Sequence, residues 1–334
     1  MDIITGGSGL LGRNLARALR DRGREVRIYD FLAPEPAVEG VEFVRGDIRD
    51  AGSVALACGG AERIYHLAAL MHVGRIEPKT VREVNIGGLE NVMAAAERRG
   101  ARRIVFTSTI ELYGVKPEVP CREDSRKEPP EGYPAHKWAS EQKLTAFMQR
   151  TGVEASFTRM PMIFGPGFYH YKIVLLFFEA LALGLPIPVL DEGGRLGKAV
   201  ALSDAVEGLT LAGERPEAAG EAFNICCEET WTHRELIEDV IGRVGSRSRV
   251  VGVPSGPLRA GFGVLAALGL NPVAEEHFNF ALHDCVYDIM KAKTLLGYAP
   301  AKSTAEALAE TYEAYMAGGR RELGKAVANS LIKK

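Results

Sequence analysis

Tyr133 and Lys137 are the residues whose types and spacing most clearly suggest chemistry in this chain. A phenol is a poor base at neutral pH because its usual pKa lies near 10. A neighbouring ammonium group stabilises the phenolate and lowers that pKa, and a positively charged cofactor ring adds to the effect. Four residues are about one helical turn, so both side chains would share one face of a helix that Pro134 helps to begin. The pair predicts a base for a hydroxyl proton; a chance pair on the surface is the alternative interpretation.

Three hydroxyl residues, Thr107, Ser108 and Thr109, stand at the end of a strand predicted over residues 103–107. Ligand sites in α/β proteins form where parallel strands end. A hydroxyl at this position would hydrogen-bond a substrate oxygen beside Tyr133. An ordinary strand end followed by a turn explains the same residues without any site.

The segment from Thr5 to Gly12 reads TGGSGLLG and contains Gly7, Gly9 and Gly12 in the GxGxxG spacing. One such glycine permits a tight turn, another lets the backbone approach a pyrophosphate, and the last lets a helix pack closely on a strand. The helix that follows would offer its free N–H groups and the positive end of its dipole to the phosphates. Because a strand is predicted just before the loop and a helix just after it, we expect a dinucleotide to bind here.

Asp30 ends the second predicted strand, where a carboxylate can accept hydrogen bonds from both ribose hydroxyls of NAD. The same charge would repel the 2′-phosphate of NADP, and no arginine or lysine follows between Phe31 and Gly40 to neutralise it. The sequence therefore predicts NAD. Asp47 follows the third strand and would either contact the adenine or cap a helix.

Short apolar runs alternate with amphipathic stretches through the first half of the chain. This alternation is typical of βαβ units, and it predicts an α/β fold with a doubly wound parallel sheet that helices cover on both faces. We expect an NAD-binding domain over residues 1–160 that also receives residues of about 198–225, and a smaller substrate lobe mainly within residues 161–334. The substrate cleft would lie between the two. Strands are expected over residues 3–5, 26–29, 42–44, 63–66, 103–107 and 155–158, and helices over residues 10–20 and 81–98.

The second half is less regular, with glycine and proline interrupting residues 161–167 and 184–197. Thr232 and Glu235 have the spacing of a capping box, which predicts that a helix begins there. A terminal helix is expected over residues 303–316. The apolar stretches 173–178 and 262–270 suit either buried helices or the wall of an apolar pocket.

Composition excludes several classes of function. The 334 residues carry a net charge of −2, so there is no general electrostatic attraction to nucleic acid or membranes. The arginines between Arg98 and Arg103 are expected on a solvated surface. Five cysteines without a CxxC pair predict free thiols rather than a disulfide framework or a metal site. We recognise no signal peptide and no stretch long enough to span a bilayer, so a cytoplasmic protein is expected.

The ordered set of motifs resembles the extended short-chain dehydrogenase/reductase superfamily, the NAD-dependent epimerases and dehydratases, over nearly the whole chain. The motifs are TGGSGLLG, Asp30, Gly46-Asp47-Ile48, His66-Leu67-Ala68-Ala69, Asn85, the segment TIELYG from Thr109, and Tyr133 with Lys137. The resemblance implies a Rossmann domain with a smaller C-terminal substrate lobe. It implies an enzyme with Tyr133 as acid and base, Lys137 as its electrostatic partner and Thr109 as a hydroxyl donor. It also implies a homodimer formed through four helices. The cofactor contacts that we expect are Gly6, Gly7, Gly9, Leu10, Leu11, Gly12, Asp30, Asp47, Ile48, Leu67, Ala68, Ala69, Asn85, Thr107, Ser108, Tyr133, Lys137, Pro161 and Met162.

Most members with this resemblance act on nucleotide sugars as epimerases, dehydratases or decarboxylases, and this is the substrate class that we expect first. Glu111 matches an acidic position at which a carboxylate handles a second proton in the dehydratases and decarboxylases, although it could merely cap a turn or pair with a lysine. The dehydratases' adjacent aspartate is Ile110 here, which argues against simple 4,6-dehydration.

Two departures favour an alternative substrate. An asparagine that contacts the substrate diphosphate in sugar-nucleotide members corresponds to Met162, and the usual phosphate-binding arginine has only Arg195 or Lys198 nearby. The Arg-x-Pro-x-x-Phe-Gly segment from Arg159 resembles instead the 3β-hydroxysteroid dehydrogenases and dihydroflavonol reductases, which bind apolar substrates. A non-catalytic NAD(H)-sensing protein is a more remote alternative, which the intact tyrosine and lysine argue against. His66, His72 and His136 could each suggest catalysis, but we expect His66 to be structural.

Overall fold

A seven-stranded parallel sheet forms the centre of the computed structural model, which describes residues 1–71, 76–168, 172–256 and 282–319. The strand order is β11-β6-β5-β4-β1-β2-β3, and it reverses between β1 and β4, where ligands bind in folds of this kind. The Rossmann-type α/β fold predicted from the sequence is therefore confirmed. The strands are β1 (Asp2–Thr5), β2 (Val26–Asp30), β3 (Glu42–Arg45), β4 (Arg63–His66), β5 (Arg103–Thr109), β6 (Glu154–Met160) and β11 (Ala222–Asn224).

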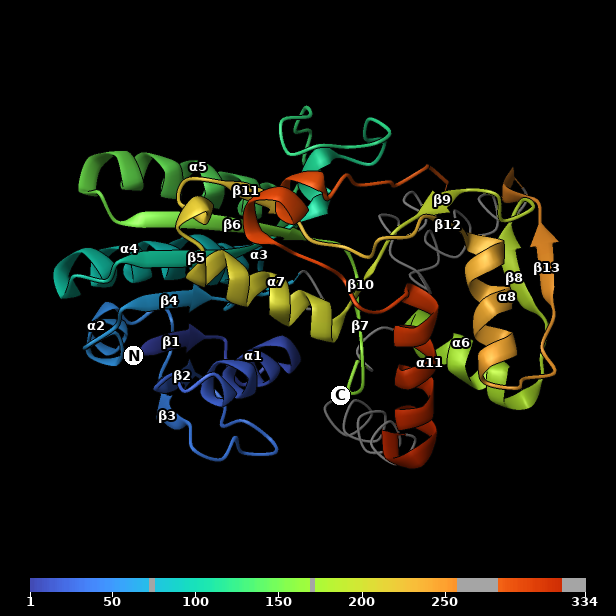
Figure 1. Ribbon diagram of the computed structural model, residues 1–334, viewed down its shortest axis with the longest axis horizontal. Helices are drawn as coiled ribbons and strands as arrows, with labels where there is room; N and C mark the ends of the chain where they lie inside the picture. The colour runs from blue at the N-terminus through green and yellow to red at the C-terminus, as the bar shows by residue number, and fades with distance from the viewer. Residues whose placement is uncertain (72–75, 169–171, 257–281, 320–334) are drawn as a thin grey trace.

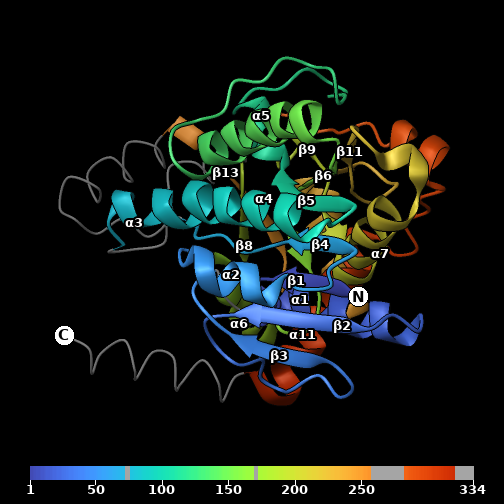
Figure 2. The same cartoon turned by 90° about the vertical axis from the view of Figure 1, so that its left-hand side faces the viewer.

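Helices cover both faces of the sheet because successive strand residues point to opposite faces. Ile4 belongs to an apolar cluster with helices α1 (Leu10–Asp21) and α7 (Leu202–Glu214). Its neighbour Ile3 belongs to a second cluster, on the face covered by α2 (Ala51–Ala57), α4 (Gly88–Arg99) and α5 (Tyr133–Thr151). Figure 2 shows these two helical layers on either side of the strands.

The helix predicted over residues 81–98 is divided. It begins earlier, as α3 (Pro78–Arg82), passes through a π-helical turn η1 (Glu83–Gly87) and continues as α4. A π turn carries one extra residue, and such turns often occur at functional sites. This turn buries Asn85.

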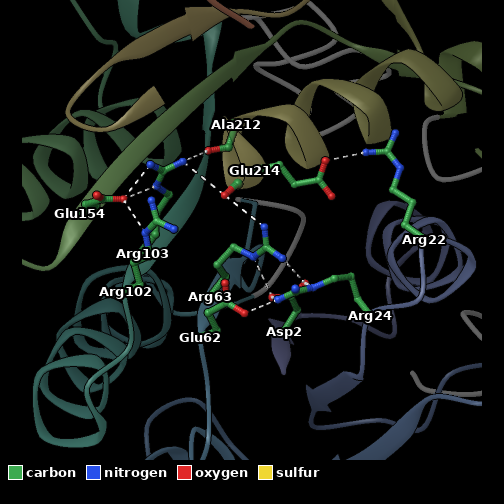
Figure 3. A network of polar contacts seen from close by, with 11 residues as sticks. Asp2, Arg22, Arg24, Glu62, Arg63, Arg102, Arg103, Glu154, Ala212 and Glu214 are labelled. Atoms are coloured by element: carbon green, nitrogen blue, oxygen red, sulfur yellow. Dashed lines mark hydrogen bonds and ion pairs between the residues drawn. The ribbon is translucent and has the colours of Figure 1, made fainter. Parts of the chain in front are cut away.

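The amino ends of the strands are held by buried ion pairs, which Figure 3 shows from close by. The carboxylate of Asp2 accepts hydrogen bonds from Arg24 and Arg63. Arg103 pairs with Glu154 and donates to the backbone oxygens of Ala212, Gly213 and Arg215, where α7 ends. Only 1% of Arg103 is exposed, so the expectation of a solvated surface is wrong for this residue, because helix carbonyls and a carboxylate replace its water.

A smaller set of elements packs beyond the sheet, around a third apolar cluster that includes Phe164, Phe178 and Leu308. Figure 1 shows α6, α8, α11, β8 and β13 grouped at the end of the molecule opposite β3 and α2. The predicted capping box at Thr232 is present, and a second one at Ser303 begins the terminal helix. The bounds are β7 (Ile163–Phe164), α6 (Lys172–Leu183), β8 (Ile187–Leu190), β9 (Leu196–Gly197), β10 (Val200–Ala201), β12 (Trp231–Thr232), α8 (His233–Arg243), β13 (Val250–Val253) and α11 (Thr304–Ala314). The short helices are η2 (Ile110–Tyr113), η3 (Pro216–Ala218), η4 (Ala292–Leu296) and η5 (Tyr315–Gly319).

The chain returns to the sheet after β10. Helix α7 and strand β11 fall within residues 198–225, the segment that the sequence assigns to the first domain, although β11 itself was not predicted as a strand. Among the described residues, no helix combines the length and apolarity needed to cross a membrane. The predictions for His72 and residues 262–270 lie outside the described residues.

Candidate functional site

The glycine loop after β1 has the conformation that a phosphate-binding turn requires. Gly6 has a φ of +71°, and a Cβ there would lie 2.6 Å from the backbone nitrogen of Ala68. A Cβ on Gly12 would lie 2.5 Å from the Cα of Gly7, so α1 packs directly on the loop. Gly9 precedes α1 and is exposed, and no side chain caps the helix. The first N–H groups of α1 therefore remain available to an anionic ligand.

A cleft of about 320 Å³ opens at the carboxyl ends of β1, β2 and β4, beside this loop. It brings together seven of the predicted cofactor contacts: Gly6, Asp30, Asp47, Ile48, Leu67, Ala68 and Ala69. Sequence reasoning missed the other lining residues, which are Tyr29, Phe31, Gly46, Arg49, Leu70, Thr80 and Val84. Arg49 follows the predicted Asp47-Ile48 motif, but its side chain carries no spacing signal of its own.

Asp30, the predicted ribose contact, lines this cleft at the end of β2. Its two carboxylate oxygens accept from the backbone N–H groups of Ser8, at 3.0 Å, and Leu32, at 3.3 Å. An ionised carboxylate offers about four lone-pair positions, so each oxygen can accept a further hydrogen bond. The residues present thus fit NAD, because Gly6 and the carboxylate of Asp30 line the cleft and the glycine loop leads directly into the amino end of α1.

Asp47 interacts with Arg49 rather than with a helix. Two guanidinium nitrogens and the backbone nitrogen of Arg49 donate to its carboxylate, and these bonds lower the pKa of Asp47. Asp50 caps α2 instead, through the N–H groups of Gly52 and Ser53. The helix-cap alternative for Asp47 is therefore wrong.

Asn85 acts through the backbone of Leu70. Its side-chain oxygen accepts from the Leu70 nitrogen at 2.7 Å, and its side-chain nitrogen donates to the Leu70 oxygen at 2.8 Å. This paired arrangement holds one wall of the cleft against the π turn. The family resemblance implies Asn85 as a cofactor contact, but the sequence could not show that the side-chain amide is bonded to the backbone of Leu70.

Tyr133 is the first residue of α5, directly after Gly132, whose φ is +88°, and Lys137 lies one turn further along the helix. Lys137 is only 3% exposed, and its amino group donates to the backbone oxygen of Thr107 at 2.6 Å. The same nitrogen lies 4.6 Å from the centre of the Phe106 ring and 5.5 Å from that of Tyr133. Burial lowers the pKa of Lys137 to about 7, against a smaller opposing effect of Glu141. The lysine is thus an enclosed amine held beside the tyrosine ring.

Strand β5 runs two residues further than predicted and carries all three hydroxyl residues. Within the described part of the chain, the buried hydroxyls of Thr107 and Ser108 have no hydrogen-bond partner. Thr109 accepts from the backbone nitrogen of Glu111 at 3.3 Å and caps the short helix η2 that bears Glu111. Buried polar atoms without partners are rare and call for an explanation, such as a ligand.

Pro161 and Met162, which the sequence predicts as cofactor contacts, are not among the residues that line the cleft, and the surroundings of Met162 are apolar. Pro161 and Met162 follow β6 and are half-buried, and Met162 packs against the cluster of Phe164 and Phe178. Leu10 contacts this cluster as well as the main core, which Leu11 also joins.

The two candidate phosphate-binding cations have protein partners. Lys198 donates to the backbone oxygens of Cys227, at 3.3 Å, and Glu228, at 3.0 Å. Arg195 is 54% exposed at its side chain and forms a long ion pair of 3.8 Å with Asp284. Of these two residues, Arg195 therefore presents the more accessible cation near β9.

The burial of His66 agrees with the expected structural role, although its Nε2 has no hydrogen-bond partner among the described residues. This histidine is buried at the end of β4, and its Nδ1 is 2.7 Å from the Thr5 hydroxyl. Burial lowers its pKa to about 3, so the imidazole is neutral at physiological pH. His136 is half-buried on α5, and burial lowers its pKa as well.

The chain is similar to one protein family and to several known enzymes. The family described as "NAD dependent epimerase/dehydratase family" matches residues 3–226. A dTDP-glucose 4,6-dehydratase of Streptomyces niveus is 30% identical over 94% of this chain and 92% of its own length. A 3β-hydroxysteroid dehydrogenase/Δ5→4-isomerase of Mycobacterium tuberculosis is 29% identical over 94% and 90%. A solved dTDP-glucose 4,6-dehydratase double mutant of Streptomyces venezuelae, with NAD bound, is 27% identical over 95% and 97%, with a TM-score of 0.73.

Proposed function

Since this chain belongs to the NAD-dependent epimerase/dehydratase family, we propose that Tyr133 is the general base for oxidation of a secondary alcohol on the substrate. NAD, when bound, supplies the acceptor for the hydride. The observation that carries the proposal is the enclosed amine of Lys137, 5.5 Å from the Tyr133 ring and anchored on the strand end at Thr107. An ammonium group in a water-poor setting stabilises a neighbouring phenolate far more than it would in water.

Lys137 and Tyr133 titrate as a pair in this proposal. Burial alone favours the neutral amine, whereas a phenolate nearby favours the ammonium form. The two ionised forms therefore stabilise each other, and a proton taken by the phenolate leaves the lysine nearer to neutrality. The bond to the Thr107 oxygen keeps the amine in place in either state.

The hydroxyl residues at the end of β5 would orient the reacting oxygen. Thr109 is assigned as the donor to the substrate oxygen that Tyr133 deprotonates. The hydroxyls of Thr107 and Ser108, which have no partner among the described residues, would be available to hydrogen-bond the bound ligands. Glu111 follows within η2 and would handle a second proton at a neighbouring carbon. These assignments depend on substrate position and are tested with it.

A nucleotide sugar is the substrate class that we propose first. The family membership and the name of the Streptomyces niveus relative support it. Ile110 is buried in the apolar core, so no acid is available at that position for 4,6-dehydration. We therefore favour an epimerase-type cycle, in which the hydride returns to the same carbon and no water is eliminated, over dehydration.

An apolar alcohol is a second candidate, favoured by the surroundings of Met162. This side chain packs on aromatic residues, and the amine of Lys198 is already bonded to two carbonyl oxygens. A substrate diphosphate would then depend mainly on Arg195. The name of the Mycobacterium tuberculosis relative is that of a steroid enzyme and agrees with this alternative.

The test is turnover with NAD of a panel of uridine and thymidine diphosphate hexoses and of 3β-hydroxysterols, by the wild type and by Tyr133→Phe. We expect one class to be converted and the variant to lose at least about a hundredfold in kcat while still binding NAD. Tyr65→Phe is the matched control, because Tyr65 is equally aromatic, buried in the sheet and lacks a hydrogen-bond partner within the described residues. Full activity of Tyr133→Phe would refute the proposal. NAD binding without turnover of either class would favour the NAD(H)-sensing alternative.

The homodimer implied by the family resemblance stays a prediction. Analytical ultracentrifugation of the full chain would check it, with and without NAD.

A further inference from the structure

Arg159 is a buried arginine that no step of the proposed reaction uses. It lies near the end of β6, and only 4% of it is exposed. Its guanidinium forms a two-pronged ion pair with Glu141 of α5, at 3.0 and 2.6 Å. Planar, bidentate pairs of this kind fix orientation as well as distance.

The same guanidinium also binds the segment that carries Glu111. It donates to the hydroxyl of Tyr113 at 2.8 Å and to the backbone oxygen of Glu123 at 2.8 Å. The Tyr113 hydroxyl in turn donates to the side-chain oxygen of Asn224 at 2.7 Å. One buried cation thus connects β6, α5, η2 and β11.

The residues that Arg159 bonds are close in the sequence to the proposed catalytic residues. Tyr113 follows Glu111 by two residues and Thr109 by four, whereas Glu141 follows Lys137 by one helical turn. Between η2 and α5, residues 114–132 form no helix and only an isolated bridge at Cys121. Continuity of secondary structure therefore does not hold the two halves of the proposed catalytic site together, and the contacts of Arg159 span them.

We propose that Glu141, Arg159 and Tyr113 are positioning residues, which orient the first turn of α5 against η2 so that Tyr133 and Thr109 converge on one substrate oxygen. The inference rests on the function proposed above. Small displacements of reacting groups cost large factors in rate, because productive geometry must be held before the reaction. A buried ion pair holds such geometry well, since neither partner can be released without leaving an unpaired charge in the interior.

The test is Tyr113→Phe, which removes one hydroxyl and keeps the ring, the ion pair and the fold. Ser156→Ala is the matched control: it lies on the same strand as Arg159, and its buried hydroxyl donates to the Ala212 oxygen at 3.0 Å, far from the site. We expect both variants to lower the melting temperature slightly. Only Tyr113→Phe should lower kcat, by about tenfold, with KM and the NAD dissociation constant changed less than twofold.

Two further measurements make the result decisive. In Tyr113→Phe, amide hydrogen exchange should rise in residues 110–113 and 133–137 and stay unchanged in β1 and β2. Wild-type kcat and unchanged exchange in Tyr113→Phe would overturn the inference, and so would an equal loss of kcat in Ser156→Ala. Tyr133→Phe is measured alongside: if it stays active, the proposed function fails, and the exchange data alone decide whether the network orients α5.

Discussion

The two edges of the central sheet differ in how their polar groups are satisfied. At the amino edge, Asp2, Arg63 and Arg103 are the first residues of their strands, and all three are buried with charged or carbonyl partners (Figure 3). At the carboxyl edge, the buried hydroxyls of Thr107 and Ser108 have no partner among the described residues, and Lys137 is an enclosed amine whose pKa is lowered to about 7. The charged side chains at the amino edge are thus paired within the described residues, whereas the two hydroxyls at the carboxyl edge are left for ligands in the function proposed above.

From this difference we expect stability and function to depend on opposite ends of the same strands. Strand direction imposes the separation, because each strand of a parallel sheet delivers its end, and the loop after it, to the same edge. Substitutions at the amino edge should therefore change the free energy of unfolding and leave kcat unchanged. Substitutions at the carboxyl edge should do the reverse.

Asp2→Asn should lower the free energy of unfolding more than any other substitution considered, and it tests the difference between the two edges most directly. The substitution leaves the guanidinium groups of Arg24 and Arg63 without their shared carboxylate, and removing one partner of a buried pair typically costs about 3–5 kcal/mol. Urea denaturation would measure the free energy of unfolding. Turnover per folded molecule should not change; a specific loss of kcat would show that the amino edge also serves catalysis.

Lys137→Met should affect activity next most strongly, with a loss of at least about a hundredfold in kcat. Its effect on stability has a predictable sign. Because the pKa is about 7 in the folded chain and 10.5 for a solvated lysine, the unfolded chain binds more protons between these values. The free energy of unfolding of the wild type should therefore rise as the pH increases from about 7 to 10.5. The whole rise should be about 1.4 kcal/mol for each unit by which folding lowers the pKa of Lys137.

The methionine variant should lack this rise, and chemical denaturation at several pH values would show it. Equal pH dependence in the two proteins would mean that Lys137 is solvated in solution, which would also remove the basis for its effect on Tyr133.

Asn85→Ala should have an intermediate effect on both properties. Both hydrogen bonds to the Leu70 backbone are lost, so we expect about 1–2 kcal/mol of destabilisation and a weaker cleft wall. NAD affinity measured by calorimetry should fall by about tenfold. Ser156→Ala provides the contrast, since it should lower stability without changing NAD binding; unchanged affinity in Asn85→Ala would show that Leu70 does not shape the cofactor site.

The smallest change in stability is expected in a matched pair of serine substitutions, Ser156→Ala and Ser108→Ala. Ser156→Ala removes a bonded hydroxyl and should cost about 1 kcal/mol, whereas Ser108→Ala removes a partnerless one and should cost less than about 0.5 kcal/mol in the absence of ligands. Thermal unfolding without and with NAD would test both. A larger cost at Ser108 would mean that its hydroxyl is satisfied in solution.

Local patterns determined much of this protein. The strand–glycine loop–helix pattern, Asp30 and the four-residue spacing of Tyr133 and Lys137 predicted the Rossmann fold, the family and NAD, all of which are confirmed. These features depend on neighbours within a few residues, where turn geometry and helical periodicity act. The roles of Tyr133, Lys137, Thr109 and Glu111 stay proposals.

Only the tertiary structure decided which polar groups are satisfied by distant partners. Arg103 donates a hydrogen bond to the end of α7, more than a hundred residues further along the chain. Asn85 bonds to the backbone of Leu70, and Arg159 bonds to both Glu141 and Tyr113. Asp50 rather than Asp47 caps α2, and residues 222–224 add a seventh strand beside β6. The physical reason is that the residue type fixes a side chain's charge and hydrogen-bonding capacity, whereas packing between helices and strands sets the distance to its partner.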